Sequence, residues 1–311
     1  MNHPSDRRIY QGSLQPAHFP ALPRDWVSEW ETFPSSDGAL QLYSAIHHKR
    51  DWKGHTALVV LHGLGEHGGR YLHFPHYVQS AVDAVYCLDH RGHGRAEGLR
   101  GHVEQFDLYA DDAALAISRI EDHLKKRFGQ SKVHLLGHSM GGLIALRTLF
   151  KYPNLPIASL SVSAPLLGIR VRVPVVKKTA AYLLSRVWGK LHMTSELDPN
   201  QLSHDQEVVE VYQKDRLNHN KVTPQFFVEL EAAIADTMRR DSGLSIPLQM
   251  MVPLQDQIVD PEASLSFFRG LKNRDKVLKT YPSFFHESFN EIGKEQVFED
   301  LVHWMNLQNS D

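Results

Sequence analysis

The sequence predicts an α/β protein built on a mostly parallel central sheet with helices on both faces. Three observations lead to this prediction. Short, continuous apolar runs, typical of strands buried on both faces, recur along the chain. Amphipathic segments separate these runs, which is the pattern of parallel strands joined by crossover helices. The alternation of strands and helices is interrupted once, between residues 168 and 243, where the pattern predicts helices only, and then it resumes.

The first part of the core, residues 29–167, follows an irregular lead-in of residues 1–28 that is rich in Pro and His. Apolar runs predict strands at residues 41–47, 56–61, 84–88, 133–136 and 160–163. Helical periodicity predicts helices at residues 71–81, 106–128 and 140–152. The last of these ends before Pro153, because the residue that precedes a proline disfavours helical backbone.

The remaining chain is predicted to hold an inserted segment and the second part of the core. The inserted segment, residues 168–243, is predicted to be a helical cap or lid with helices at residues 175–188, 206–213 and 224–239. In the second part of the core, residues 244–311, we expect strands at 247–252 and 277–281 and helices at 263–271 and 295–307.

The composition is that of an ordinary folded protein without a strong electrostatic bias. Of 311 residues, 42% are hydrophobic and 23% are charged, which is enough apolar material for a sizeable core. The 34 basic and 36 acidic residues leave a formal charge of −2, so the basic excess typical of nucleic-acid-binding proteins is missing. No secretory signal and no run of about 18 apolar residues is present, which predicts a cytoplasmic protein in which any membrane contact is peripheral.

A candidate nucleophile lies in the pentapeptide Gly137-His138-Ser139-Met140-Gly141. It fits the pattern G-x-S-x-G, directly after an apolar strand and directly before a helix, which is the context of a nucleophile elbow. The flanking glycines allow strand and helix to approach closely while the Ser139 hydroxyl projects above the sheet. A chance match on an ordinary turn is the alternative, and the strand, the helix and the additional Gly142 favour the catalytic interpretation.

A glycine-rich turn after the strand at 56–61 predicts an oxyanion hole. The turn reads His62-Gly63-Leu64-Gly65, and the hole of this architecture uses one amide from such a loop and the amide that follows the nucleophile. The donors would be the N–H groups of Leu64 and Met140. An ordinary turn between a strand and a helix is the alternative.

The general base and its orienting acid are expected after late strands, in the chain order serine, acid, histidine. Asp256 follows the strand at 247–252, and His286 follows the strand at 277–281, so both fit. Two other residues fit these roles less well. Asp260 precedes Pro261 and is better explained as the N-cap of the next helix, and His303 falls inside the last helix.

Metal and thiol chemistry are not predicted. The sequence has no H-E-x-x-H motif and no cysteine pair, and His73 and His76 are expected to be a surface pair on one helix face. Cys87 is the only cysteine, which rules out an intrachain disulfide. It lies in an apolar run and is expected to be buried and inert.

Five segments together resemble the monoacylglycerol lipases and related lysophospholipases. Residues 62–71 (HGLGEHGGRY) are similar to the family's H-G-x-G-E-H-x-x-R-Y, and residues 89–94 (DHRGHG) to its D-x-R-G-H-G. Residues 137–142 (GHSMGG), 256–261 (DQIVDP) and 286–291 (HESFNE) match three further motifs. The segment before Asp256 departs from the family pattern, because Val252-Pro253-Leu254-Gln255 stands where His-Gly-x-x is usual.

The resemblance implies an α/β-hydrolase fold with a helical cap between the sixth and seventh strands. It also implies Ser139, Asp256 and His286 as a catalytic triad and the Leu64 and Met140 amides as oxyanion donors. The expected reaction is hydrolysis of lipid carboxylic esters without a cofactor, with monoacylglycerol cleaved to glycerol and fatty acid through an acyl-enzyme on Ser139. A lysophospholipase or general carboxylesterase, a proline-type aminopeptidase and an inactive binding module on the same fold remain alternatives.

One amphipathic stripe in the inserted segment has two interpretations. Its apolar members are Val175, Val176, Leu183, Leu184, Val187 and Trp188. The stripe would line an acyl channel or touch a membrane surface, or it would pack against the body of the protein.

Overall fold

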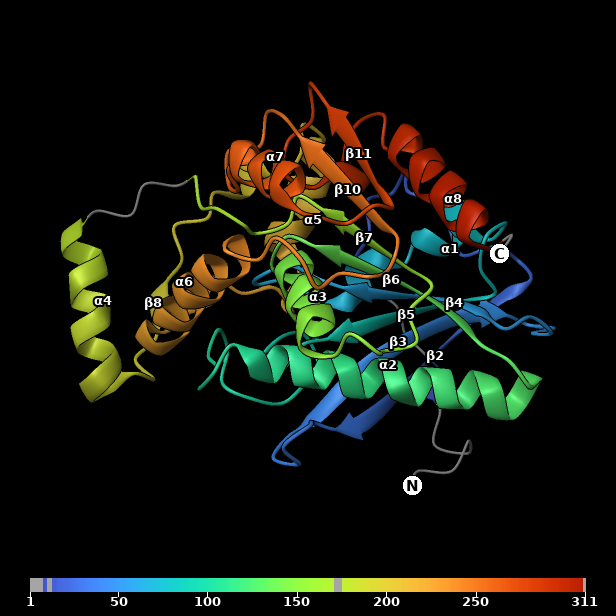
Figure 1. The fold of residues 1–311 in the computed structure, drawn as a ribbon, viewed down its shortest axis with the longest axis horizontal. Coiled ribbons are helices and arrows are strands. Elements are labelled where there is room, and N and C mark those ends of the chain that lie inside the picture. Colours follow the sequence, from blue (N-terminus) through green and yellow to red (C-terminus); the bar gives the residue numbers. More distant parts are fainter. Residues whose placement is uncertain (1–7, 10–12, 171–174, 310–311) are drawn as a thin grey trace.

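A nine-stranded sheet forms the centre of the computed structural model, which describes residues 8–9, 13–170 and 175–309 (Figure 1). The strand order is β1-β2-β3-β5-β4-β6-β7-β10-β11. Pairings among β1, β2, β3 and β5 are antiparallel, and those from β5 through β4 to β11 are parallel. The strands are β1 (Arg8–Ile9), β2 (Trp26–Pro34), β3 (Gln41–Lys49), β4 (Thr56–Leu61), β5 (Ala84–Asp89), β6 (Lys132–His138), β7 (Ser159–Ser163), β10 (Leu248–Pro253) and β11 (Lys276–Tyr281).

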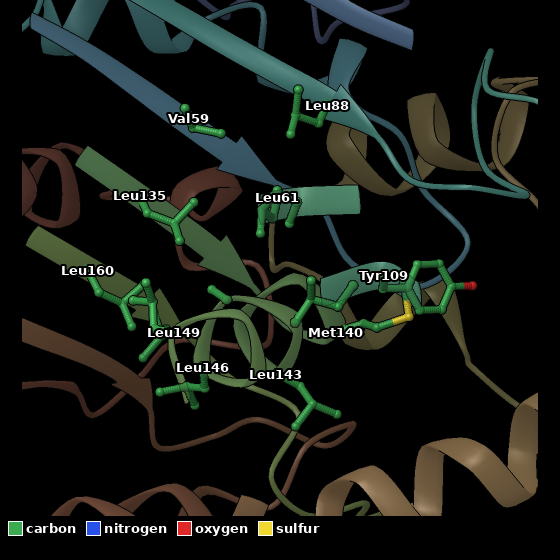
Figure 2. Packing of buried hydrophobic residues seen from close by; sticks show 14 of the residues in the cluster. Val59, Leu61, Leu88, Tyr109, Leu135, Met140, Leu143, Leu146, Leu149 and Leu160 are labelled. Atoms are coloured by element: carbon green, nitrogen blue, oxygen red, sulfur yellow. The ribbon is translucent and has the colours of Figure 1, made fainter. Parts of the chain in front are cut away.

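Helices cover both faces of this sheet, because alternate residues of each central strand point to opposite sides. Val59 and Leu61 of β4 belong to one buried cluster, with α2 and α3, whereas Leu58 and Val60 belong to another, with α1 and α8. Figure 2 shows the first cluster, in which leucines of α3 pack against leucines of the strands. The helices of the core are α1 (Phe74–Val78), α2 (Asp107–Phe128), α3 (Met140–Lys151), α7 (Pro261–Gly270) and α8 (Glu295–Asn309), with 3₁₀ turns η2 (Gly68–Tyr71) and η4 (Ser288–Asn290).

The chain between β7 and β10 leaves the sheet and forms the layer at one end of it (Figure 1). Arg147 of α3 ties this layer to the core through ion pairs with Asp107 and Asp236. Its elements are α4 (Val175–Trp188), β8 (Met193–Thr194), η3 (Pro199–Gln201), α5 (Gln206–Lys214), β9 (Lys221–Val222) and α6 (Pro224–Met238).

The structure confirms the predicted α/β architecture and corrects three details. Regular structure starts before Glu29, because β1 and the first residues of β2 fall within residues 1–28. The helix predicted at 71–81 is the short α1 after a 3₁₀ turn, with Pro75 in its first turn. The inserted segment is not purely helical, since β8 and β9 pair as a small antiparallel sheet.

The loops that carry polar residues meet at one edge of the sheet. Parallel strands end at the same edge, and in open α/β sheets this is where ligands bind. Strands β4, β6, β7, β10 and β11 run parallel to one another, so the loops that follow them converge there. Within the described ranges, no helix has the length and apolar character needed to cross a membrane.

Candidate active site

Ser139 occupies a strained turn between β6 and α3. Its φ of 53° and ψ of −118° are unusual for a residue with a side chain. A Cβ atom on Gly137 would come within 2.3 Å of the Gly141 carbonyl oxygen, and one on Gly141 within 2.0 Å of the Leu61 carbonyl oxygen. Only glycine fits at both positions, which explains the spacing of the motif in terms of backbone contacts.

His286 lies between Ser139 and Asp256. Its Nε2 atom is 2.9 Å from Ser139 Oγ, and its Nδ1 atom is 2.7 Å from Asp256 Oδ2. The other oxygen of Asp256 accepts the backbone N–H groups of Ile258 and Val259, which fixes the carboxylate. The structure thus brings together the three residues expected from sequence, in an order that lets an imidazole accept a hydroxyl proton.

Burial and charge act in opposite directions on His286. The side chain is buried, which disfavours the imidazolium form, but the adjacent Asp256 carboxylate favours it. The attraction to Asp256 prevails, and the pKa of His286 lies above its ordinary value of 6.5. Protonation during a reaction is therefore made easier by the charge behind the ring.

The rival residues lie elsewhere, as expected. Asp260 caps α7 by accepting the N–H of Glu262, and His303 is exposed on α8. The expected surface pair of histidines is wrong for His73, which is buried with its Nε2 atom 3.2 Å from the Phe289 carbonyl oxygen.

Pro253 does not disturb the path toward Asp256. It is the last residue of β10 and pairs in register with Tyr281 of β11. The chain resumes hydrogen bonding at once, because the Leu254 N–H donates to the Tyr281 carbonyl oxygen at 3.0 Å. Proline has no backbone N–H to donate, and here that absence falls on the last residue of the strand.

The loop after β4 passes close to Ser139. A Cβ atom on Gly63 would lie 3.2 Å from the Ser139 Cβ atom. Among the described residues, no acceptor is found for the backbone N–H groups of Leu64 and Met140. Met140 is also the first residue of α3, where the helix dipole favours negative charge. Both N–H groups are therefore free to donate to a group bound beside Ser139.

A cavity of about 460 Å³ opens above Ser139 and His286. Helices α4 and α6 of the inserted segment supply much of its wall, and the wall is mostly apolar. Four polar side chains gather at one end of the cavity. Sequence pattern predicted no role for them, although three lie in the segments that resemble the lipase family. The apolar lining includes Leu166, Ala181, Leu184, Phe226, Leu230 and Ile258, and the polar end is formed by Glu66, His138, Tyr212 and Glu287.

The apolar stripe on α4 divides between two faces. Leu184 lines the cavity, whereas Leu183, Val187 and Trp188 are 63%, 72% and 66% exposed. The side chains of Val175 and Val176 lie outside the described residues. One face of α4 therefore meets the cavity, and the opposite face presents apolar side chains to solvent.

Metal-binding and thiol chemistry gain no support from the arrangement of side chains. In the part of the chain that the structure describes, no group of three or more His, Cys, Asp or Glu residues could hold a metal ion. Cys87 is buried in β5, and burial raises the pKa of its thiol. This agrees with the inert thiol expected from sequence.

Comparison with known proteins shows similarity over most of the chain. A family profile described as "Serine aminopeptidase, S33" matches residues 53–293. Phospholipase YtpA of Bacillus subtilis (strain 168) is 30% identical over 244 residues, 78% of this chain and 92% of the relative. The monoacylglycerol lipase of Mycolicibacterium smegmatis is 29% identical over 251 residues, 80% of this chain and 87% of the relative.

A longer relative and a solved structure complete the comparison. An uncharacterized abhydrolase domain-containing protein of Dictyostelium discoideum is 29% identical over 255 residues, and the chain covers only 26% of its length. The crystal structure of the monoacylglycerol lipase of Paleococcus ferrophilus matches with a TM-score of 0.74 at 28% identity. That match covers 86% of this chain and 99% of the solved chain.

Proposed function

The chain belongs to the α/β-hydrolase family described as serine aminopeptidase, S33, and on this premise we propose that it hydrolyses carboxylic esters of lipids. Its similar relatives include proteins named monoacylglycerol lipase and phospholipase. The preferred substrate is a monoacylglycerol, cleaved to glycerol and a fatty acid. The observation that carries the proposal is the hydrogen-bonded series Ser139–His286–Asp256 at the base of an apolar cavity.

The proposed reaction begins with proton transfer from Ser139 Oγ to His286 Nε2. Oγ forms a bond to the ester carbonyl carbon, and the N–H groups of Leu64 and Met140 bind the resulting oxyanion. The intermediate collapses as His286 donates its proton to the leaving alcohol oxygen and the carbon–oxygen bond breaks. Water, deprotonated by His286, then attacks the acyl-enzyme, and the proton returns to Ser139 Oγ as the fatty acid leaves.

The cavity supports a fatty-acyl substrate. Apolar residues of α4 and α6 line the cavity beside Ser139. Replacing water on this surface with an acyl chain would be favourable, because apolar surface would be removed from water. The inserted segment, residues 168–243, would then act as the cap of the active site. We further propose that the outer face of α4, which exposes Leu183, Val187 and Trp188, contacts a membrane surface from which substrate enters.

A lysophospholipase is the second candidate, favoured by the relative named phospholipase YtpA. A general carboxylesterase would use the same residues with less selectivity. An aminopeptidase is supported by the description of the family profile alone. It would need an anionic group for the substrate's amino terminus, and the glutamates at the polar end of the cavity are already paired with Arg70.

A substrate panel tests the proposal. Wild type and Ser139→Ala are compared on monoacylglycerol, lysophosphatidylcholine, a short nitrophenyl ester and an amino-terminal peptide substrate. We expect hydrolysis of the esters by wild type alone, together with labelling of Ser139 by a fluorophosphonate. Peptide cleavage without ester cleavage, or ester cleavage that survives Ser139→Ala, would overturn it.

A further inference from the structure

A buried arginine bridges two carboxylates beside the active site. Arg70 NH1 donates to Glu66 Oε2 at 2.6 Å and to Glu287 Oε1 at 2.5 Å, and its NH2 donates to Glu287 Oε2 at 2.7 Å. All three side chains are less than 10% exposed. The reaction described above makes no use of this cluster, which we call the Arg70 clamp (Arg70, Glu66 and Glu287).

One end of the clamp holds the loop that carries an oxyanion donor. Glu66 Oε1 accepts the backbone N–H of Gly63 at 2.6 Å and the hydroxyl of Tyr71 at 3.1 Å. Gly63 directly precedes Leu64, so the bond to Gly63 fixes the peptide plane next to the proposed donor. A carboxylate that accepts from a backbone amide forms one of the stronger hydrogen bonds in proteins.

The other end holds the loop that carries the base. Glu287 directly follows His286, and its carboxylate accepts two of the three guanidinium hydrogen bonds and one from the side-chain amide of Asn290. A bidentate pair fixes direction as well as distance. The backbone of Glu287 is held too, because its N–H donates to the Leu202 carbonyl oxygen of the inserted segment.

The clamp is shielded from water, which increases the effect of its charges. The Arg70 guanidinium carbon lies 4.8 Å from the centre of the Tyr212 ring of α5, a cation–π contact. Burial opposes ionisation of Glu287, but attraction to Arg70 prevails and holds the pKa of that carboxyl below its ordinary value. Leaving one buried carboxylate without its guanidinium would be costly.

We propose that Arg70 is a positioning residue: it fixes the Leu64 amide relative to the His286 imidazole by joining Glu66 to Glu287. The two carboxylates share one guanidinium, so the clamp also leaves excess negative charge beside the ring that becomes cationic in the reaction. The inference rests on the proposed function, since it assigns the clamp a part in the same ester hydrolysis.

The test compares two buried arginines replaced by lysine. Arg70→Lys keeps the charge and loses the bidentate geometry. Arg91→Lys is the matched control, because Arg91 is equally buried and makes a bidentate pair with Asp112 at 2.7 and 2.9 Å, in a cluster that contains no residue of the proposed site. Tm, kcat and KM are measured for both variants on whichever ester the wild type hydrolyses.

For Arg70→Lys we expect kcat to fall about 10²-fold with KM within about threefold, as for a displacement of about 1 Å in a reacting group. Arg91→Lys is expected to lower Tm while kcat stays within about threefold of wild type. Wild-type kcat in a folded Arg70→Lys protein, or equal losses of kcat in both variants, would overturn the proposal. A wild type that neither cleaves esters nor reacts with a fluorophosphonate would instead refute the proposed function.

A pH profile separates positioning from general loosening. Around His286 the charged and titratable groups are Asp256 from the loop after β10, His138 at the end of β6, and Glu66, Arg70 and Glu287 of the clamp. Glu66→Gln removes a negative charge, so the acid limb of kcat/KM should move to lower pH. Arg70→Lys keeps all charges, so the acid limb of its kcat/KM profile should stay at the wild-type pH while kcat falls. An unmoved limb in Glu66→Gln would contradict the charge effect.

Discussion

Replacing Asp256 with asparagine is the sharpest test of how His286 is held. Asparagine keeps the shape of the side chain, and its oxygen can still accept the Ile258 and Val259 amides. Its NH₂ group would then face His286 Nδ1, now 2.7 Å from a carboxylate oxygen. A donor at this place requires Nδ1 to be the acceptor, so the ring proton moves to Nε2, the atom that must receive the proton of Ser139.

The expected loss distinguishes two explanations. If only a charge-assisted hydrogen bond were lost, the transition state would lose about 1.5–3 kcal/mol of stabilisation, and the rate would fall roughly 10- to 150-fold. A ring held in the wrong tautomer has no base at all, and such a change costs about 10⁴-fold in kcat. We therefore expect about 10⁴-fold, equivalent to about 5.4 kcal/mol.

The assay is kcat and KM on a short nitrophenyl ester, with thermal unfolding measured in parallel. Asp260→Asn is the control, because Asp260 lies four residues further on and only caps α7, a task that asparagine performs equally well. Its kcat should stay within about twofold of wild type. A loss of less than tenfold in Asp256→Asn, or an equal loss in Asp260→Asn, would refute the reasoning.

Three further outcomes follow from the geometry. Gly141→Ala should lower the free energy of unfolding by more than about 2 kcal/mol, because the new Cβ would come within 2.0 Å of the Leu61 carbonyl oxygen. The urea midpoint should fall accordingly, and a wild-type midpoint would contradict this. Since His286 must be neutral to accept a proton and its pKa lies above 6.5, kcat/KM should fall as pH drops, with its midpoint above pH 6.5; a midpoint below 6 would count against the raised pKa. Replacing Leu183 and Trp188 with serine should weaken co-sedimentation with lipid vesicles and leave hydrolysis of a soluble short ester unchanged, and unaltered sedimentation would argue against membrane contact.

Local sequence pattern was enough to predict the central sheet and to select three side chains that the structure brings together. The strands at β4, β5 and β6 are continuous apolar runs because they are buried on both faces, and such runs are visible in the sequence itself. Ser139, Asp256 and His286 follow strands that end at one edge, so topology alone brings their loops together. Position after a strand thereby distinguished His286 from the other histidines.

Features that depend on tertiary contact could not be predicted in the same way. Leu183 and Leu184 are neighbours of identical type, yet one is exposed and the other lines the cavity, because only the docking of α4 decides which side faces inward. The strand β2 (Trp26–Pro34) was not predicted at all, since most of its side chains are only half-buried, which hides the alternation of a strand. Glu66, Arg70 and Glu287 appear in the quoted motifs, but their mutual contact spans more than 200 residues of sequence.

The contacts of the inserted segment imply that it does more than cover a substrate. Tyr212 packs on the guanidinium of the clamp, and the Leu202 carbonyl oxygen accepts the backbone N–H of Glu287. The His219 N–H donates to the carbonyl oxygen of Gly65, one residue after the proposed oxyanion donor Leu64. The segment therefore contacts both loops whose relative position matters in the proposed reaction. Its α4 and α6 side lines the cavity, and its α5 side contacts the clamp. Under the proposed function, substrate fit and catalytic geometry would therefore depend on different faces of the same insertion.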